Sequence, residues 1–350
     1  MSWKTWVLLG LTFAVGLFTL FSIATRLPTP PEHQVFVNGD VLTMDAENRV
    51  VQAMSVRGER IEALGSNEDM MALVDDRTEV IDLAGRTLMP GFIDAHGHFP
   101  GSALNTVSVD LNSPPIGTME NMEDLLAALR ARAAQLPAGE WVTGFGYDDT
   151  LLAEGRHPTR EELDAVAPEH PVALLHISGH MVVANSRALE AVGIDAETPD
   201  PEGGVIGRTP SGELTGLLEE TARLPVAERM LDLGAMDFLR MVSAAVREYA
   251  EYGVTTAQAG GVAPQMVGGF KLASGLGLMP LRIDVGAVKI VADGSIQGFT
   301  GYLTRPYHTP FHGDEDYRGY AAVPRERLFE QIETLHAAGL QIAVHGNGDA

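Results

Sequence analysis

The sequence contains no cysteine. This excludes disulfide frameworks, thiol nucleophiles and cysteine-based zinc or iron–sulfur sites. Positive charge is also scarce, because 24 Lys and Arg residues stand against 47 Asp and Glu residues, a formal net charge of −23. Nucleic acid is therefore not an expected partner, since the protein has no basic surplus with which to neutralise phosphates. Any bound metal must be held by histidine, carboxylate or modified lysine.

The chain is long and apolar enough to build a sizeable core. It has 350 residues, of which 45% are hydrophobic and 20% are charged, and this composition excludes wholesale disorder. The length suggests two or three domains of roughly 100–200 residues each, or one barrel with an accessory module. The 38 glycines and 20 prolines indicate many turns between short elements.

The first 26 residues differ in kind from the rest. Residues 6–24 carry no charge, and a helix of this length would cover about 28 Å, close to the thickness of a bilayer core. We expect residues 1–26 to be a signal anchor and residues 27–33 to be a Pro-rich linker. A cleaved signal peptide and a buried core helix are the alternatives. A signal anchor and a cleaved signal peptide both imply that the remainder of the chain is exported. With an uncleaved anchor, the remainder would lie on the periplasmic or exterior side of the membrane.

Residues 34–90 predict a small β module, because apolar and polar positions alternate there. The stretch contains three turn signals between β-rich runs, at Asn38-Gly39, at Arg57-Gly58 and at Gly85. Each of these is typical of a hairpin.

Beyond Pro90, short apolar runs alternate with amphipathic stretches, a pattern typical of parallel α/β structure and most simply of a (β/α)₈ barrel. We assign residues 91–350 to this barrel and residues 195–215 to a loop. The apolar runs are Gly91–Asp94, Trp141–Phe145, Val172–Ile177, Val254–Ala257, Leu281–Ala292 and Leu340–His345. The helical stretches are Glu123–Leu136, Arg160–Val166, Ser186–Val192, Leu231–Tyr252 and Arg325–Ala338.

Three of these runs end in, or contain, potential metal ligands. His96 and His98 follow the first run, and residues i and i+2 of an extended segment point to the same side, so both can reach one ion. Their alternative is a pair of surface histidines in a Gly-rich turn. His345 closes the last run, where a ligand and a satisfied histidine are equally compatible with the sequence.

Lys289 lies inside an apolar run, where an ammonium group is costly. Burial favours the neutral amine, which reacts with CO₂ to a carbamate able to bridge two metal ions. The alternatives are a lysine paired with a buried carboxylate and one that extends to the strand end. Asp293 follows either as a partner of the ligands or as a turn cap, and Asp349 either orients His345 or caps the next helix.

Seven segments together resemble the amidohydrolase superfamily, specifically the YtcJ-like group (amidohydrolase family 3), from about Val35 to the end. They are LMPGFIDAHGHF, WVTGFGYDDT, HPVALLHISGHMVVANSRAL, GGVIGRTPSGELTGLLEE, YGVTTAQAGG, AVKIVADGSIQGFTGYLTRPY and QIAVHGNGDA. The resemblance implies a metal-bearing barrel beside a β-sandwich built from both chain ends, of which residues 34–90 would be the N-terminal part. By motif match, the metal ligands would be His96, His98, the carboxylated Lys289 and His345.

Other positions are candidates for binding substrate. His180 is similar to the family's substrate-facing loop, and Glu220 to its recurring carboxylate. Tyr147 and Asp148 follow a strand and could line the pocket. The alternative for His180 is a histidine that stabilises its own loop. The alternative for Glu220 is a position on a solvated helix face, and that for Tyr147 and Asp148 is a simple turn. His176 is expected to be a core residue.

The family pattern also expects a further histidine ligand and a general-base aspartate beyond residue 350, so no catalytic base is assigned. Because an incomplete barrel has open sheet edges, we interpret the chain as a fragment of a longer enzyme, with a naturally short protein as the alternative.

The resemblance implies a hydrolase for non-peptide, amide-like C–N bonds of small molecules, using one or two divalent ions, with Zn²⁺ preferred, and a metal-activated hydroxide. The alternative is a non-catalytic exported fragment or a membrane-anchored metal- or ligand-binding module.

Overall fold

The computed structural model describes residues 31–262, 264–311 and 313–350. The predicted anchor, and most of the predicted linker, lie outside these ranges. Within them, no helix combines the length and the apolar character needed to cross a membrane. The chain divides into two compact units. The first runs to Ala95 and adds Val246–Ala257 and Pro264–Asp284, and the second comprises His96–Ala245, Gln258–Ala263 and Val285–Ala350.

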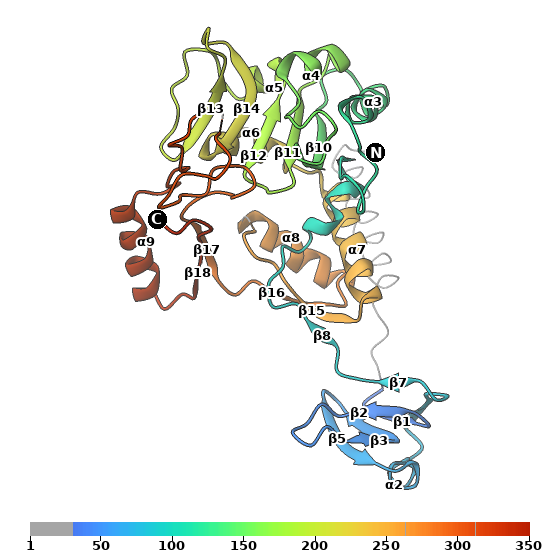
Figure 1. The fold of residues 1–350 in the computed structure, drawn as a ribbon. Coiled ribbons are helices and arrows are strands. Elements are labelled where there is room, and N and C mark those ends of the chain that lie inside the picture. The colour runs from blue at the N-terminus through green and yellow to red at the C-terminus, as the bar shows by residue number, and fades with distance from the viewer. Residues whose placement is uncertain (1–30, 263, 312) are drawn as a thin grey trace, which may run out of the picture. The chain divides into compact units, whose positions relative to one another are not determined.

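The N-terminal part of the first unit is a β module of two small sheets (Figure 1). Their strand orders are β5-β4-β1-β6 and β3-β2-β7. The strands are β1 (His33–Val37), β2 (Asp40–Leu42), β3 (Val50–Val51), β4 (Ala53–Arg57), β5 (Arg60–Gly65), β6 (Thr78–Asp82) and β7 (Thr87–Leu88), with helix α2 (Asn67–Met71) between β5 and β6. The alternating burial of β1 matches the predicted pattern.

One of the three predicted hairpins forms. β4 and β5 pair antiparallel around Gly58, which has a φ of 59°. The hairpins predicted at Asn38-Gly39 and Gly85 are wrong, because each turn passes the chain from one sheet to the other. β1 instead pairs parallel with β6, and β2 with β7. In this arrangement β1 lies between β4 and β6 and buries alternate residues.

The remaining strands of the first unit form a three-stranded sheet of order β16-β15-β8. They are β8 (Phe92–Ile93), β15 (Val254–Gln258) and β16 (Arg282–Asp284). Helix α7 (Ala235–Glu251) precedes β15, and helix α8 (Pro264–Gly275) follows it. β8 and β15 run parallel, as the strand–helix alternation predicts.

The second unit is built around a six-stranded mixed sheet of order β13-β14-β12-β11-β10-β9. Its strands are β9 (Val109–Asp110), β10 (Val142–Tyr147), β11 (Val172–His176), β12 (Met181–Ala184), β13 (Gly204–Arg208) and β14 (Leu214–Glu220). The first three run parallel, and the others join by antiparallel pairing. The loop predicted at residues 195–215 is therefore wrong in part, because β13 and the start of β14 lie within it.

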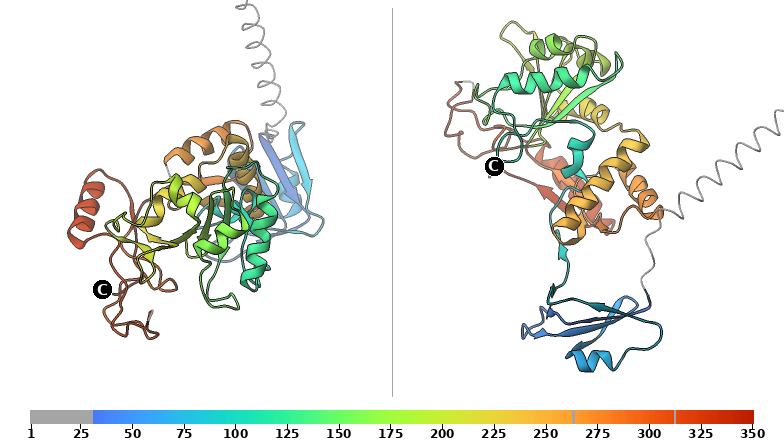
Figure 2. Two further views of the ribbon diagram at one scale, coloured as in Figure 1. Left: turned by 90° about the horizontal axis from the view of Figure 1, so that it is seen from above. Right: turned by 90° about the vertical axis from the view of Figure 1, so that its right-hand side faces the viewer.

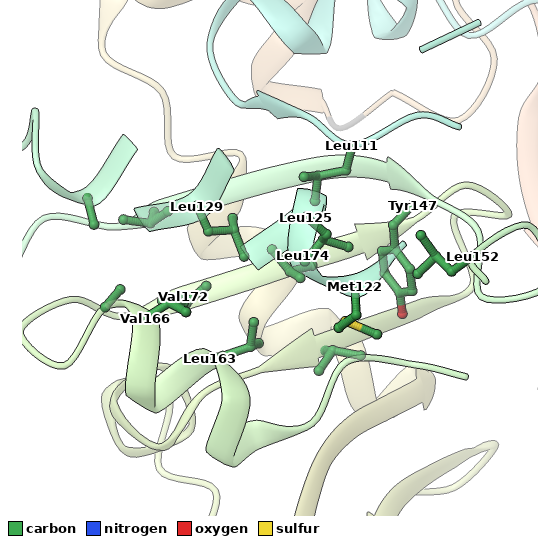
Figure 3. Close-up of a cluster of buried hydrophobic side chains, with 14 residues drawn as sticks. Leu111, Met122, Leu125, Leu129, Tyr147, Leu152, Leu163, Val166, Val172 and Leu174 are labelled. Carbon is green, nitrogen blue, oxygen red and sulfur yellow. The ribbon is translucent and has the colours of Figure 1, made fainter. Parts of the chain in front are cut away.

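Helices cover both faces of this sheet (Figures 1 and 2). They are α3 (Met122–Ala133), α4 (Arg160–Val166), α5 (Ser186–Ala191) and α6 (Leu224–Met230), with short 3₁₀ turns at η1 (Gly101–Thr106) and η2 (Thr221–Arg223). Val172 and Leu174 pack with α3 and α4, whereas Ala173 packs in the cluster that includes residues of α5 and α6. Figure 3 shows the first of these clusters, with Leu125 and Leu129 of α3 beside Leu174. A strand that is buried on both faces is typical of parallel α/β structure.

The C-terminal part of the second unit contains the parallel pair β17 (Val288–Val291) and β18 (Ile342–His345), with helix α9 (Arg325–Ala337) beside β18 (Figure 1). The α/β class is confirmed. The described strands form five separate sheets, so the described residues do not form a closed barrel.

The cluster around α3 generates a stability prediction. Leu125 is fully buried, so Leu125→Ala should lower the free energy of unfolding by about 2–5 kcal/mol through lost burial and a cavity. Arg130→Ala is the control on the same helix, since Arg130 is exposed, and should change stability by less than about 0.5 kcal/mol. Urea denaturation followed by circular dichroism measures both. Equal effects would contradict the assigned core.

Candidate functional site

The parallel pairing of β17 and β18 brings two predicted ligands together. Lys289 lies opposite Ala343, and His345 lies opposite Val291, so the two residues lie on adjacent strands, two register positions apart. Burial lowers the pKa of His345, and its electrostatic interactions with His180 and Lys289 lower it further. The imidazole of His345 is therefore neutral at neutral pH, which is the form that binds metal ions.

Asp293 fixes the turn that follows His345. Its carboxylate accepts the backbone N–H groups of Asn347 at 2.8 Å, Gly348 at 2.6 Å and Tyr302 at 2.8 Å. The side chain is buried, and three charge-assisted hydrogen bonds hold it rigidly. It thus caps the turn, one of the two roles expected from the sequence. Asp349 accepts hydrogen bonds from the backbone and hydroxyl of Thr304, and its two expected roles stay predictions.

His180 and Glu220 meet beside His345. The rings of His180 and His345 stack with centroids 4.9 Å apart and an interplanar angle of 30°. Nδ1 of His180 lies 2.9 and 3.1 Å from the two oxygens of Glu220, and the Thr300 hydroxyl donates to the same carboxylate at 2.7 Å. Two residues predicted to face substrate therefore share one polar cluster with a predicted ligand.

Glu220 adopts a strained backbone. Its φ of 48° and ψ of −118° are sparsely populated for a residue with a side chain, at a cost of about 1–3 kcal/mol. Gly294 allows this arrangement, because a Cβ there would collide with Oε1 of Glu220 and with Thr300. Strain of this kind gathers at functional sites, which supports Glu220 as a functional residue.

His96 and His98 form a second pair. Their rings lie 5.7 Å apart between centroids, in an edge-to-face arrangement, as two side chains at positions i and i+2 should. Nδ1 of His98 contacts the carbonyl oxygen of Gly260 at 2.7 Å, and residue 98 bridges to Ala259 after β15. This contact leaves Nε2 of His98 as the atom available to a ligand.

Among the described residues, one group of three or more His, Asp or Glu side chains brings its ligand atoms within 4.8 Å of one another, close enough for a metal ion. It consists of Asp148, Asp149 and His176. The histidines 96, 98 and 345 do not form such a group in this structure. The predicted four-ligand set is thus present as two pairs and stays a prediction.

The ends of β10 and β11 carry a buried polar network. His176 is fully buried, as expected, but its Nε2 contacts Oδ1 of Asp149 at 3.0 Å and its Nδ1 contacts the Ser178 hydroxyl at 2.8 Å. Tyr147 is also fully buried, and its hydroxyl lies 3.2 Å from Nδ1 of His157. Burial raises the pKa of Asp149, but the His176 hydrogen bond and the charges of His157 and His176 lower it more, so the net pKa is below its usual value.

Asp148 belongs to the same strand end. It accepts hydrogen bonds from the backbone and hydroxyl of Thr150 and from the side chain of Gln297. Asp148 thereby ties β10 to the segment after β17. The pocket role predicted for Tyr147 and Asp148 stays a prediction, because both side chains are buried and already hydrogen-bonded.

Sequence reasoning missed Asp149, His157 and Ser178. Asp149 directly follows Asp148, and Ser178 lies two positions before His180, so their closeness to residues that the sequence did single out was the available signal. His157 lies ten residues beyond Tyr147 and carried no such signal.

Comparison with known protein families identifies the family of this chain. The amidohydrolase family model matches residues 79–350. The chain belongs to the amidohydrolase family. It is 36% identical over 254 residues to an N-substituted formamide deformylase of Arthrobacter pascens, which covers 71% of this chain and 46% of that protein. It is 29% identical over 345 residues to the amidohydrolase YtcJ of Bacillus subtilis (strain 168), which covers 90% of this chain and 63% of that protein.

The fold of this amidohydrolase also occurs in a solved structure. A metal-dependent hydrolase from Pyrococcus horikoshii OT3 matches with a TM-score of 0.66 and 23% identity, over 91% of this chain and 65% of the other. The chain spans about half to two thirds of the length of these relatives. The similarity to YtcJ confirms the resemblance that the seven sequence motifs indicated.

Glu219 predicts a pH dependence of stability. Burial raises its pKa from 4.5 to about 7, against the hydrogen bond from Tyr320 and with the charge of Glu220 adding to the rise. The folded protein therefore holds this proton more tightly than the unfolded chain, so stability falls by roughly 3 kcal/mol as pH rises from 4.5 to 7.

Glu219→Gln keeps an acceptor for Tyr320 without the ionisation. We expect this variant to lose that part of the pH slope and to be more stable than the parent at pH 8. Glu213→Gln, at an exposed position, is the control and should keep the parental slope. Denaturation at a series of pH values measures it, and identical slopes in all three proteins would contradict the raised pKa.

Proposed function

We propose that this amidohydrolase is a metal-dependent hydrolase of non-peptide, amide-like C–N bonds in small molecules. The observation that carries the proposal is the polar cluster at the end of β18, where His345 stacks on His180 and His180 contacts Glu220, with Lys289 on the adjacent strand β17. The family membership and the deformylase among the relatives support the reaction class. A (β/α)₈ barrel in the complete protein is part of the same proposal.

The donor chemistry fits a divalent ion. His96, His98 and His345 offer imidazole nitrogens, and Lys289 would offer carbamate oxygens once carboxylated. Nitrogen and oxygen donors without a thiolate suit Zn²⁺. Bound there, such an ion would supply Lewis-acid activation of the carbonyl and of a water molecule. Coordination requires the two pairs of residues to approach a common centre to about 2.0–2.2 Å.

The chain's own residues would then bind and orient the substrate. Nδ1 of His180 donates to Glu220, and in a neutral ring Nε2 then carries the lone pair. This nitrogen can accept a hydrogen bond from the N–H of an amide-like substrate. Glu220 and Thr300 hold the ring at that angle, so the polar contact is already formed before substrate enters.

His345→Asn and Lys289→Met test this site in the full-length protein. Each should lose stoichiometric metal and more than about 100-fold of the activity, because even residues that only support ligands cost 10–100-fold when removed. His308→Asn is the control, since His308 is exposed and was not assigned to the site. Plasma mass spectrometry gives the metal content, and hydrolysis of N-substituted formamides gives the activity.

The outcomes separate the two functions considered from the sequence. Full metal content and full activity in both variants would reject the ligand assignment. Metal binding by the parent protein without hydrolysis of any amide-like compound would instead favour the metal- or ligand-binding module.

We further propose that the protein is exported. The support is the uncharged run at residues 6–24. Protease added to spheroplasts, whose outer envelope is open, should digest the protein, and fractionation should show whether it stays with the membrane. Protection from external protease without membrane disruption, together with recovery from the cytosol, would reject export.

A further inference from the structure

The turn between β11 and β12 determines where His180 lies. β11 ends at His176 and β12 begins at Met181, so only four residues connect them. Gly179 adopts a φ of 74°, and its N–H donates to the carbonyl of His176 at 2.9 Å. A short turn has few conformations, and the contacts that select one of them also select the position of His180.

The imidazole of His176 contacts this turn through Ser178. Its Nδ1 lies 2.8 Å from the hydroxyl of Ser178 and 3.2 Å from the backbone N–H of the same residue. The Ser178 hydroxyl oxygen accepts the backbone N–H of His180 at 3.2 Å. The buried ring is thus joined by two successive hydrogen bonds to the backbone of His180.

Asp149 determines the tautomer of that ring. Oδ1 of Asp149 lies 3.0 Å from Nε2 of His176, and a carboxylate can only accept, so Nε2 carries the proton. Nδ1 is then the acceptor that Ser178 requires. If the proton moved to Nδ1, it would face the backbone N–H of Ser178, so that contact would be lost and the Ser178 hydroxyl would have to reverse its direction of donation.

These hydrogen bonds weigh against a metal ion at this place. Nε2 of His176 is occupied by its proton, and both oxygens of Asp148 accept hydrogen bonds from protein groups. The close spacing of Asp148, Asp149 and His176 is therefore explained by hydrogen bonding within the protein.

We propose that Asp149 and His176 are positioning residues, which fix the β11–β12 turn through Ser178 so that His180 meets Glu220 and stacks on His345. The inference rests on the proposed function for its effect on turnover, and on the contacts above for its effect on structure. Neither residue touches His345 through the described hydrogen bonds, so both act through His180.

Asp149→Asn tests the proposal with almost no change in volume. The amide can donate to Nε2 and so stabilise the wrong tautomer of His176, as in the serine-protease triad when the aspartate is replaced. In the full-length enzyme we expect kcat for N-substituted formamides to fall about 10²-fold, the cost of a misplaced polar group, while KM changes less than about threefold. Bound metal should stay at the parental stoichiometry.

Asp164→Asn is the matched control. Asp164, like Asp149, is an aspartate that accepts side-chain hydrogen bonds. Its donors are the backbone and hydroxyl of Ser186, at 3.0 and 2.6 Å, and within the described residues it makes no hydrogen bond with His176, His180 or Glu220. Its variant should keep the parental kcat. Ser178→Ala should reproduce the effect of Asp149→Asn, and Ser178→Thr, which keeps the hydroxyl, should restore most of the activity.

A second readout does not depend on activity. Hydrogen exchange measured by NMR should show the His180 amide exchanging at least about tenfold faster in Asp149→Asn, with the amides of β10 and β11 unchanged. If the parent hydrolyses no formamide, the proposed function fails, and the exchange experiment still decides this inference. Parental exchange at His180, or the loss of one metal equivalent in Asp149→Asn, would overturn it.

Discussion

The hydrogen bond between His180 and Glu220 joins the parts of the site. It links the β11–β12 turn to the end of β14, and Thr300 adds the segment after β17 to the same carboxylate. A buried carboxylate is costly unless donors satisfy it, and here both donors come from different segments. The strained backbone of Glu220 persists because these contacts over-determine it. Separating any one segment would leave a buried acceptor unsatisfied.

Two aspartates each stabilise a turn next to this cluster. Asp293 holds the turn after His345 through three backbone N–H groups, and Asp149 holds the turn before β12 through His176. The stacked rings of His180 and His345 thus belong to two separately fixed turns. A site built in this way aligns its polar groups before substrate binds, which lowers the entropic cost of the reaction.

The sequence predicted the strands that carry candidate site residues better than it predicted which strands pair with one another. The apolar run that contains Lys289 and the one that ends at His345 carried enough signal to place both residues on strands, and the structure pairs these strands. β13 and the start of β14 were not predicted, because the Gly- and Pro-rich residues 195–215 resemble a loop in composition. The turn at Asn38-Gly39 was misassigned for a related reason, since turn chemistry is local and strand pairing is not.

The site shows the same limit. His180 and Glu220 were candidates from motif similarity, but their mutual hydrogen bond and the strain at Glu220 depend on tertiary contacts. Asp149 and His157 gain their meaning only from His176 and Tyr147, which the fold places next to them. No periodicity in the sequence reports such a network.

The most direct test of the account is anomalous diffraction at the zinc edge from crystals of the complete protein grown with Zn²⁺. The account predicts a peak within about 2.0–2.3 Å of nitrogen atoms of His96, His98 and His345, with density for a carboxylated Lys289 beside it. A peak bound instead by Asp148, Asp149 and His176, with none near His345, would contradict it.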